Sequence, residues 1–294
     1  MIGVDWGTSN FRAYLLAVDG AILERRAAPR GILQVEAGKF AETLSAEVGD
    51  WVARGEERIL LCGMVGSRQG WRETAYVPCP AGIKELARAI VAVPFERAHV
   101  RLIPGVSAED REGVPDVMRG EETKIVGLAA GLAGGGLVCL PGTHSKWVRC
   151  AEGRISRFAT HMSGEVFGVL RGHSILGRMM RPGPLDWPAF DWGLKRGGEP
   201  GGLLHHLFGV RALGLAGRLD ETSSASYLSG LLIGHEVRAE LAAPGVVHLI
   251  GEPRLVAQYA RAIAAVGGTV EEGDEDAVAR GLTAIGARAD WGAG

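Results

Sequence analysis

The chain has 294 residues, of which 47% are hydrophobic and 22% are charged, and its formal net charge is −2. This balance is typical of a globular protein and excludes a largely disordered chain. Because there is no surplus of basic side chains to hold nucleic acid or an anionic membrane, we expect a small-molecule partner.

The cysteines and the N-terminal sequence favour a cytoplasmic protein. The four cysteines form no CxxC pair, and Cys62, Cys139 and Cys150 lie in apolar runs, which is typical of reduced, buried thiols. The first ten residues, MIGVDWGTSN, lack the basic segment and the long apolar core of a signal peptide.

The first half of the chain is predicted to form three strands followed by alternating helices and strands. Asp19-Gly20 indicates a hairpin turn, and Phe40, Leu44, Val48 and Trp51 recur at helical spacing. The predicted elements are strands at 1–6, 11–18, 21–28, 58–62 and 99–103, helices at 36–53, 83–91 and 121–132, and a glycine-rich loop at 63–82.

The second half repeats this order, which indicates an internal duplication. The predicted elements are strands at 137–141, 145–151, 154–160, 246–250 and 268–271, and helices at 164–180, 203–217, 223–242, 253–266 and 274–288. Residues 181–202, rich in Pro, Gly and Trp, are predicted to form a surface loop or lid. We expect two related α/β halves with ligands in a central cleft between them.

Two polar turns at equivalent positions of the halves are candidate phosphate loops. Gly7, Thr8 and Ser9 follow the first strand, and Gly142, Thr143, Ser145 and Lys146 follow the strand that opens the second half. Glycine lets successive N–H groups point into one concavity, and the hydroxyls and the lysine add donors. The alternative is a pair of plain hairpins with polar turns, although the repetition favours phosphate. Walker A and GxGxxG sequences are absent.

Two further positions complete the nucleotide prediction. Asp5, at the end of the first strand, can hold a Mg²⁺ ion through water, since hard cations want oxygen ligands. Gly251 and Glu252 lie where a buried strand meets a helix, and a glycine there lets an adenosine ring pack on the backbone. A routine strand-to-helix turn is the alternative.

Several stretches resemble one family of sugar-acid kinases. They are MIGVDWGTSNFRAYLL at 1–16, CGMVGSRQGWRETAYVPCPAG at 62–82, RGEET at 119–123, LPGTHSKWV at 140–148, THMSGEVFGVL at 160–170 and LSGLLIGHEV at 228–237. Together they resemble the 2-dehydro-3-deoxygalactonokinase family, within the superfamily of sugar kinases, heat-shock protein 70 and actin. The DWGTS turn is shared across the superfamily, whereas LPGTHSKW and GMVGSRQGW are specific to the family.

This resemblance implies a fold and a reaction. The fold is two duplicated ribonuclease H-like (actin-like ATPase) domains: 1–120 on the substrate side with 274–294 packing back on it, a linking helix at 121–133, and 134–273 on the nucleotide side. The reaction is transfer of phosphate from ATP, with Mg²⁺, to 2-dehydro-3-deoxy-D-galactonate, giving the 6-phosphate. A homodimer is an open expectation.

The resemblance also implies roles for individual residues. Glu121 begins the linking helix, where related sugar kinases have the catalytic base, with Glu122 and Asp5 as alternatives. The alternative for both glutamates is that acidic residues simply stabilise a helix N-terminus electrostatically. His144 joins the second phosphate loop. The residues expected to bind the sugar acid are Ser67, Arg68, Gln69, Trp71, Arg12 and Gly31, with Arg68 on the carboxylate.

Other readings stay open. Arg68 has a structural salt bridge as its alternative role. The substrate has the 2-dehydro-3-deoxygluconate epimer as its alternative, because a few hydrogen bonds in the 63–82 loop decide that choice. An ATPase, a regulatory sensor or a phosphatase on the same fold is the alternative class, since fold does not fix function.

Overall fold

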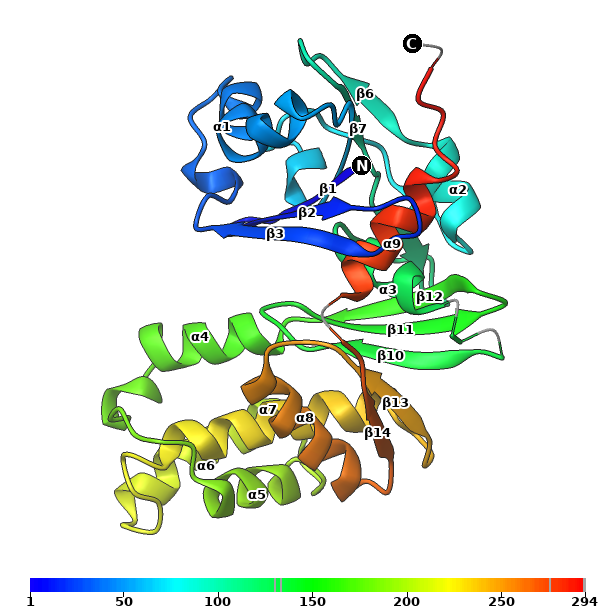
Figure 1. The fold of residues 1–294 in the computed structure, drawn as a ribbon. Coiled ribbons are helices and arrows are strands. Elements are labelled where there is room, and N and C mark those ends of the chain that lie inside the picture. The colour runs from blue at the N-terminus through cyan, green and yellow to red at the C-terminus, as the bar shows by residue number, and fades with distance from the viewer. Residues whose placement is uncertain (130, 133, 275, 293–294) are drawn as a thin grey trace. The chain divides into compact units, whose positions relative to one another are not determined.

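The computed structural model describes residues 1–129, 131–132, 134–274 and 276–292 (Figure 1). It divides into two compact units. The first contains the described residues of 1–136, 148–158 and 274–294, and the second contains 137–147 and 159–273. The first unit includes α3 (Glu121–Ala129), the helix expected to link the domains, together with residues 134–136 and 148–158, which were expected in the second domain.

The first unit is built on a mixed sheet with the strand order β3-β2-β1-β4-β7-β6. β1 pairs antiparallel with β2 and parallel with β4, and β4 pairs parallel with β7. The strands are β1 (Ile2–Trp6), β2 (Phe11–Leu16), β3 (Ile22–Ala28), β4 (Arg58–Cys62), β6 (Val91–Val93) and β7 (His99–Leu102). A smaller sheet contains β5 (Val77–Pro78), β8 (Val106–Glu109) and β9 (Pro115–Met118).

The helices of this unit are α1 (Phe40–Ala53), α2 (Ile83–Arg88), α3 (Glu121–Ala129) and α9 (Ala277–Gly286), with 3₁₀ turns η1 (Ile32–Gln34) and η2 (Met64–Gly66). The four apolar residues at helical spacing in α1 are all buried, which confirms the predicted helix face. α1 lies over the sheet and is joined to β3 by a polar network.

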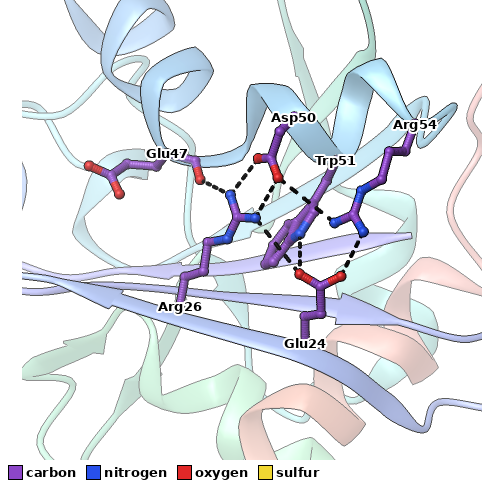
Figure 2. A network of polar contacts seen from close by, with 6 residues as sticks. All are labelled: Glu24, Arg26, Glu47, Asp50, Trp51 and Arg54. Carbon is purple, nitrogen blue, oxygen red and sulfur yellow. Dashed lines mark hydrogen bonds and ion pairs between the residues drawn. The ribbon is translucent and has the colours of Figure 1, made fainter.

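This network connects four charged side chains, from β3, α1 and the residue after α1, around an indole ring (Figure 2). The Arg26 guanidinium lies 3.9 Å from the centre of the Trp51 ring and donates to both carboxylate oxygens of Asp50. The Trp51 indole N–H and Arg54 both donate to Glu24, each at 2.8 Å. Paired opposite charges therefore join β3 to the end of α1 around the Trp51 ring.

α9 and α3 pack at backbone distance through two glycines. A Cβ at Gly127 would lie 1.9 Å from the Ala277 carbonyl oxygen, and a Cβ at Gly281 would lie 1.9 Å from the Thr123 carbonyl oxygen. Because no larger residue fits at either position, the glycines set how closely the last helix approaches α3 (Figure 1).

The second sheet has the order β12-β11-β10-β13-β14, and β11 and β12 contribute residues to both units. β10 pairs parallel with β13, and β13 with β14. The strands are β10 (Gly136–Leu140), β11 (Ser145–Ala151), β12 (Arg154–His161), β13 (Val246–Leu249) and β14 (Thr269–Glu272).

The helices of the second unit form two hydrophobic clusters, one of which packs on the sheet residues. They are α4 (Ser163–His173), α5 (Trp187–Arg196), α6 (Gly202–Leu215), α7 (Ser224–Glu240) and α8 (Pro253–Ala265), with the 3₁₀ turn η3 (Gly177–Met179). Among the described residues, every helix falls short of the length or apolar character that crossing a membrane requires.

The prediction of a loop over the whole of 181–202 was wrong. Residues Trp187–Arg196 form α5, which packs against α7 and buries Phe190 and Leu194. Asp186 caps this helix: its carboxylate accepts a hydrogen bond from the Ala189 N–H at 3.2 Å and another from the Ser223 hydroxyl at 2.5 Å. The segment is therefore part of the core of the second unit.

Candidate functional site

Asp5 lies near the carboxyl end of β1, between the two neighbouring strands. It is opposite Arg12 of β2 and Cys62 of β4, and Arg12 Nη1 lies 3.8 Å from Asp5 Oδ2. Burial raises the pKa of Asp5, and the positive charges of Lys124 and Arg12 lower it in part. A desolvated carboxylate with a raised pKa is suited to accepting a proton or facing a hard cation.

The turn after β1 has the exposed hydroxyls expected of a phosphate loop. Thr8 and Ser9 are exposed, and the Gly7 N–H donates to the Asn10 carbonyl at 2.9 Å. Gly31 supports this turn from behind, because a Cβ there would lie only 2.2 Å from the Thr8 carbonyl oxygen. This contact accounts for the glycine at position 31, and its role toward the sugar acid stays a prediction.

Two glycines bring the start of α3 beside Asp5. Gly63 has a φ of +96°, and a Cβ there would lie 2.7 Å from the Trp6 carbonyl oxygen and 3.3 Å from Asp5 Oδ1. A Cβ at Gly120 would lie 3.0 Å from the Gly63 Cα. The ends of β1 and β4 and the residue before α3 therefore meet at one point in the first unit.

The two glutamates at the start of α3 have different surroundings. Glu122 is fully buried, and its carboxylate accepts from the Gly120 N–H at 2.5 Å and from the Thr123 hydroxyl at 2.9 Å. Burial, and then the negative charge of Glu121, raise the pKa of Glu122 to about 8. Glu121 is only partly buried. Glu122 thus holds the first turn of α3, and Glu121 is the more accessible carboxylate.

The residues of the 67–71 turn point in different directions. Arg68 and Gln69 are exposed, and the Arg68 side chain retains 88% of its accessible surface, with its Nε 3.7 Å from a Glu73 carboxylate oxygen. Ser67 points inward: its Oγ is closed to solvent and has no hydrogen-bond partner among the described residues. Arg68 makes a weak surface ion pair in this structure, and its predicted contact with the sugar-acid carboxylate stays a prediction.

Trp71 lies against the hydrophobic core of the first unit. Its ring stacks on Phe40 with centroids 6.3 Å apart, and it meets Phe95 edge-on at 6.5 Å. These contacts explain a tryptophan at position 71 by packing, and the prediction that it covers the sugar chain stays untested.

In the second candidate phosphate loop, residues 142–146, the side chains before β11 are exposed or partly buried, and those within β11 are buried. Gly142 is partly buried, while Thr143 and His144 are exposed, and His144 pairs with the Glu165 carboxylate at the start of α4. A Cβ at Gly164 would lie 2.3 Å from the Gly142 carbonyl oxygen, so α4 begins directly against this loop.

Ser145 and Lys146 are already part of the strand and are buried. The Lys146 ammonium donates to the Thr160 hydroxyl at 2.6 Å. The Ser145 and Tyr259 hydroxyls are 2.8 Å apart, and Tyr259 donates its own proton to Glu236, so Ser145 is the donor of this bond. The predicted phosphate contacts of these two side chains stay untested. Their present partners are the half-buried Thr160 and the buried Tyr259.

A buried carboxylate is the centre of this polar network. Glu236 of α7 accepts from the Trp147 indole N–H at 2.7 Å and from the Tyr259 hydroxyl at 2.8 Å, and all three residues are buried. Sequence reasoning missed the network, because its members come from β11, α7 and α8. It fixes the strand after the second loop to the two helices.

A pocket of about 310 Å³ lies within the second unit and joins the two predicted nucleotide segments. Gly142 and Glu252 both line it, together with Ser226, Ser229 and Arg254. Glu252 caps α8, accepting from the Arg254 and Leu255 N–H groups at 3.1 and 3.3 Å. A Cβ at Gly251 would lie 3.5 Å from Pro141, an ordinary contact distance.

Known proteins resemble the chain over nearly its whole length. The family described as 2-keto-3-deoxy-galactonokinase matches residues 5–285. The 2-dehydro-3-deoxygalactonokinase of Escherichia coli (strain K12) is 36% identical over 272 residues, 90% of each chain. A Rhizobium meliloti (strain 1021) protein assigned the same activity is 38% identical over 296 residues, 98% of this chain and 96% of that one.

Solved structures show the same relationship. The crystal structure of a candidate 2-dehydro-3-deoxygalactonokinase from Sinorhizobium meliloti has a TM-score of 0.87 and 37% identity, covering 97% of this chain and 95% of that one. The activator of the 2-hydroxyisocaproyl-CoA dehydratase from Clostridium difficile, solved with ADPNP, has a TM-score of 0.51 and 12% identity, covering 98% and 95%. The second likeness shows the mixed α/β fold alone.

Proposed function

The chain belongs to the 2-keto-3-deoxy-galactonokinase family, and we propose from this that it phosphorylates 2-dehydro-3-deoxy-D-galactonate at its 6-hydroxyl with ATP. The two names describe the same sugar acid. The observation that carries the proposal is the match of the family over residues 5–285, together with relatives of that activity at 36–38% identity. The gluconate epimer is the alternative substrate.

The pocket of the second unit is the proposed site of the nucleotide. Its mixed lining of apolar, hydroxyl and cationic side chains suits a nucleoside, and it extends from Gly142 of the second loop to Glu252 and Arg254 at the start of α8. Thr143 and His144, exposed beside Gly142, are then the donors available to phosphate oxygens.

Asp5 would hold the Mg²⁺ that accompanies ATP, through water. Among the described residues, no three His, Cys, Asp or Glu side chains gather as a metal cage. One carboxylate beside exposed hydroxyls fits Mg²⁺, because this ion keeps several waters and takes its remaining ligands from one or two carboxylates and from phosphates. When bound, the ion neutralises charge on the phosphates.

The first unit supplies the proposed proton acceptor. Glu121 and Asp5 are the two carboxylates near the Gly63–Gly120 contact that are partly exposed, whereas Glu122 is buried against Gly120 and Thr123. We assign the base to Glu121 and leave Asp5 as the alternative. Thr8 and Ser9 hydroxyls would donate to the transferred phosphoryl group.

The strand order supports duplicated halves. In the first sheet β1 stands third, after β3 and β2, and pairs parallel with β4. In the second sheet β10 stands third, after β12 and β11, and pairs parallel with β13. We propose that each sheet is a ribonuclease H-like copy, and that the first binds the sugar acid and the second the nucleotide. Because ATP is held inside cells, the proposed reaction belongs in the cytoplasm.

ADP release tests the function. Mg·ATP is supplied with 2-dehydro-3-deoxy-D-galactonate, with its gluconate epimer, and without any sugar acid. We expect turnover with the galactonate compound and little without sugar. Equal turnover of the two epimers would extend the proposed substrate range to both acids. ATP hydrolysis without a sugar acid would favour an ATPase or phosphatase over a kinase.

A further inference from the structure

Arg119 is a buried cation whose charge is not neutralised by the protein. Its exposed fraction is 8%, and its guanidinium donates to the Thr74 hydroxyl and, at 2.9 Å, to the Thr74 carbonyl oxygen. It also lies 4.4 Å from the centre of the Tyr76 ring. Among the described residues, no carboxylate lies within 4.0 Å of it, and its Nε–H has no acceptor.

A second donor without a partner, Ser67, belongs to the segment 66–74, which packs against Arg119. Thr74 N–H donates to the Gly66 carbonyl at 2.9 Å, and a Cβ at Gly66 would lie 3.1 Å from Arg119 Nη1. Ser67 is the next residue, and its buried Oγ also has no partner among the described residues. The Arg119 guanidinium therefore lies against Gly66, the residue before Ser67, and each of the two side chains has one buried polar atom without a partner among the described residues.

Such an arrangement is costly without a ligand. Removing a cation from water without a counter-charge is strongly unfavourable, and buried polar groups in folded proteins nearly always have partners. A planar guanidinium with a free Nε–H edge matches a carboxylate, and a serine hydroxyl matches a neighbouring oxygen.

We propose that Arg119 binds the carboxylate of the sugar acid and that Ser67 donates to an oxygen next to it. This inference rests on the proposed function, which supplies an acid as the substrate. It assigns to Arg119 the role that the sequence suggested for Arg68, whose side chain is almost fully exposed and pairs weakly with Glu73.

The two side chains lie on the two segments that meet beside Asp5. Gly63 and Gly120 are in contact there, Ser67 follows Gly63 by four residues, and Arg119 directly precedes Gly120. The phosphate-accepting hydroxyl and the carboxylate stand at opposite ends of the six-carbon substrate. Both donor atoms are closed to solvent in this structure, so the proposed binding requires the residues around them to open.

The test compares the acid with its neutral C1 carboxamide in the full-length protein. For each variant, kcat/KM is measured with both compounds, and binding is measured separately as the rise in melting temperature with each compound alone. Truncating one partner of a buried charge pair typically weakens binding by about 30-fold or more. We expect Arg119→Gln to reduce the preference for acid over amide by that factor, while KM for ATP is unchanged.

Matched variants keep the result specific. Arg101→Gln removes another arginine of the first unit whose guanidinium contacts backbone carbonyls, and should keep the preference. Ser67→Ala changes only a hydroxyl and should raise KM for the acid several-fold, so it covers the case in which Arg119→Gln does not fold.

Each outcome decides a separate point. An unchanged acid preference in Arg119→Gln, or an unchanged KM in Ser67→Ala, overturns the assignment, and loss of the preference in Arg68→Ala alone moves the role to Arg68. If the wild-type protein binds the acid without turnover, the kinase proposal fails. The rise in melting temperature with the acid, compared between the wild type and Arg119→Gln, then still tests whether Arg119 binds the carboxylate. If it neither binds nor converts the acid, both proposals fall.

Discussion

Replacing Tyr259 by phenylalanine tests the buried network of the second unit. The change removes one hydroxyl and leaves the ring, which is 2% exposed. Among the described residues, Glu236 then keeps only the Trp147 donor, and the Ser145 hydroxyl loses its acceptor. The buried carboxylate and the serine must find water or stay unsatisfied.

The expected loss follows from the charge on the acceptor. A hydrogen bond to a charged group contributes about 1.5–3 kcal/mol, and an orphaned buried partner adds to the loss. For a protein of this size each 1 kcal/mol shifts the melting temperature by roughly 2 °C, so Tyr259→Phe should melt about 3–6 °C below the wild type. Thermal unfolding followed by tryptophan fluorescence measures the difference.

Tyr227 provides the matched control. It is equally buried, in α7 of the same unit, and among the described residues its hydroxyl makes no hydrogen bond. Tyr227→Phe should therefore change the melting temperature by about 1 °C or less. Equal shifts in the two variants would show that the network does not stabilise the fold and refute the reasoning.

Three further predictions concern the first unit. Gly281→Ala places a Cβ 1.9 Å from the Thr123 carbonyl oxygen and should destabilise by about 1–3 kcal/mol or more in urea unfolding, whereas Gly172→Ala, with open space around it in α4, should not destabilise. Arg26 lowers the pKa of Asp50 to about 2. The wild type should therefore be more stable than Asp50→Asn above about pH 4, and this advantage should fade as the pH falls toward 2. A difference in melting temperature between the two proteins that stays constant over that range would exclude a stabilising role of this ion pair. Asp5→Asn should lower kcat by about 100-fold or more with an unchanged melting temperature, measured by ADP release, and near-normal turnover would remove Asp5 from the chemistry.

The sequence predicted most of the regular structure because its periodicities are strong. Phe40, Leu44, Val48 and Trp51 lie on one buried face of α1, and the apolar runs before Asp5 and Gly63 are buried strands. The expected α/β class is confirmed. The short strands β6, β8 and β9 were missed because each has three or four residues and exposed positions interrupt its pattern.

The missed helix α5 shows how composition can mislead. Prolines and glycines on both sides of 187–196 favoured a loop, yet Asp186 followed by Pro188 is a start signal, a capping carboxylate with proline in the first turn. Reading that signal would have predicted the helix. Its buried face then follows from contact with α7, which no local pattern reveals.

The site was predicted less completely because burial depends on contacts between distant residues. The strand that begins at Ser145 was predicted, but the sequence does not show that the Ser145 and Lys146 side chains are both buried. Arg119 and Arg68 are equally cationic in sequence. Only the fold shows that one is buried beside Ser67 and the other faces solvent.

The last helix of the chain has a consequence for synthesis on the ribosome. Leu282 of α9 packs on Gly3 of β1, and Gly281 packs on α3, so the first unit lacks the α9 layer until residues 277–286 have been made. At about 5–20 residues per second, the roughly 140 residues between positions 136 and 277 take about 7–30 s to make. For that time the apolar surface that α9 covers is open to chaperones and to other nascent chains, while the second unit, contained within 137–273, completes first.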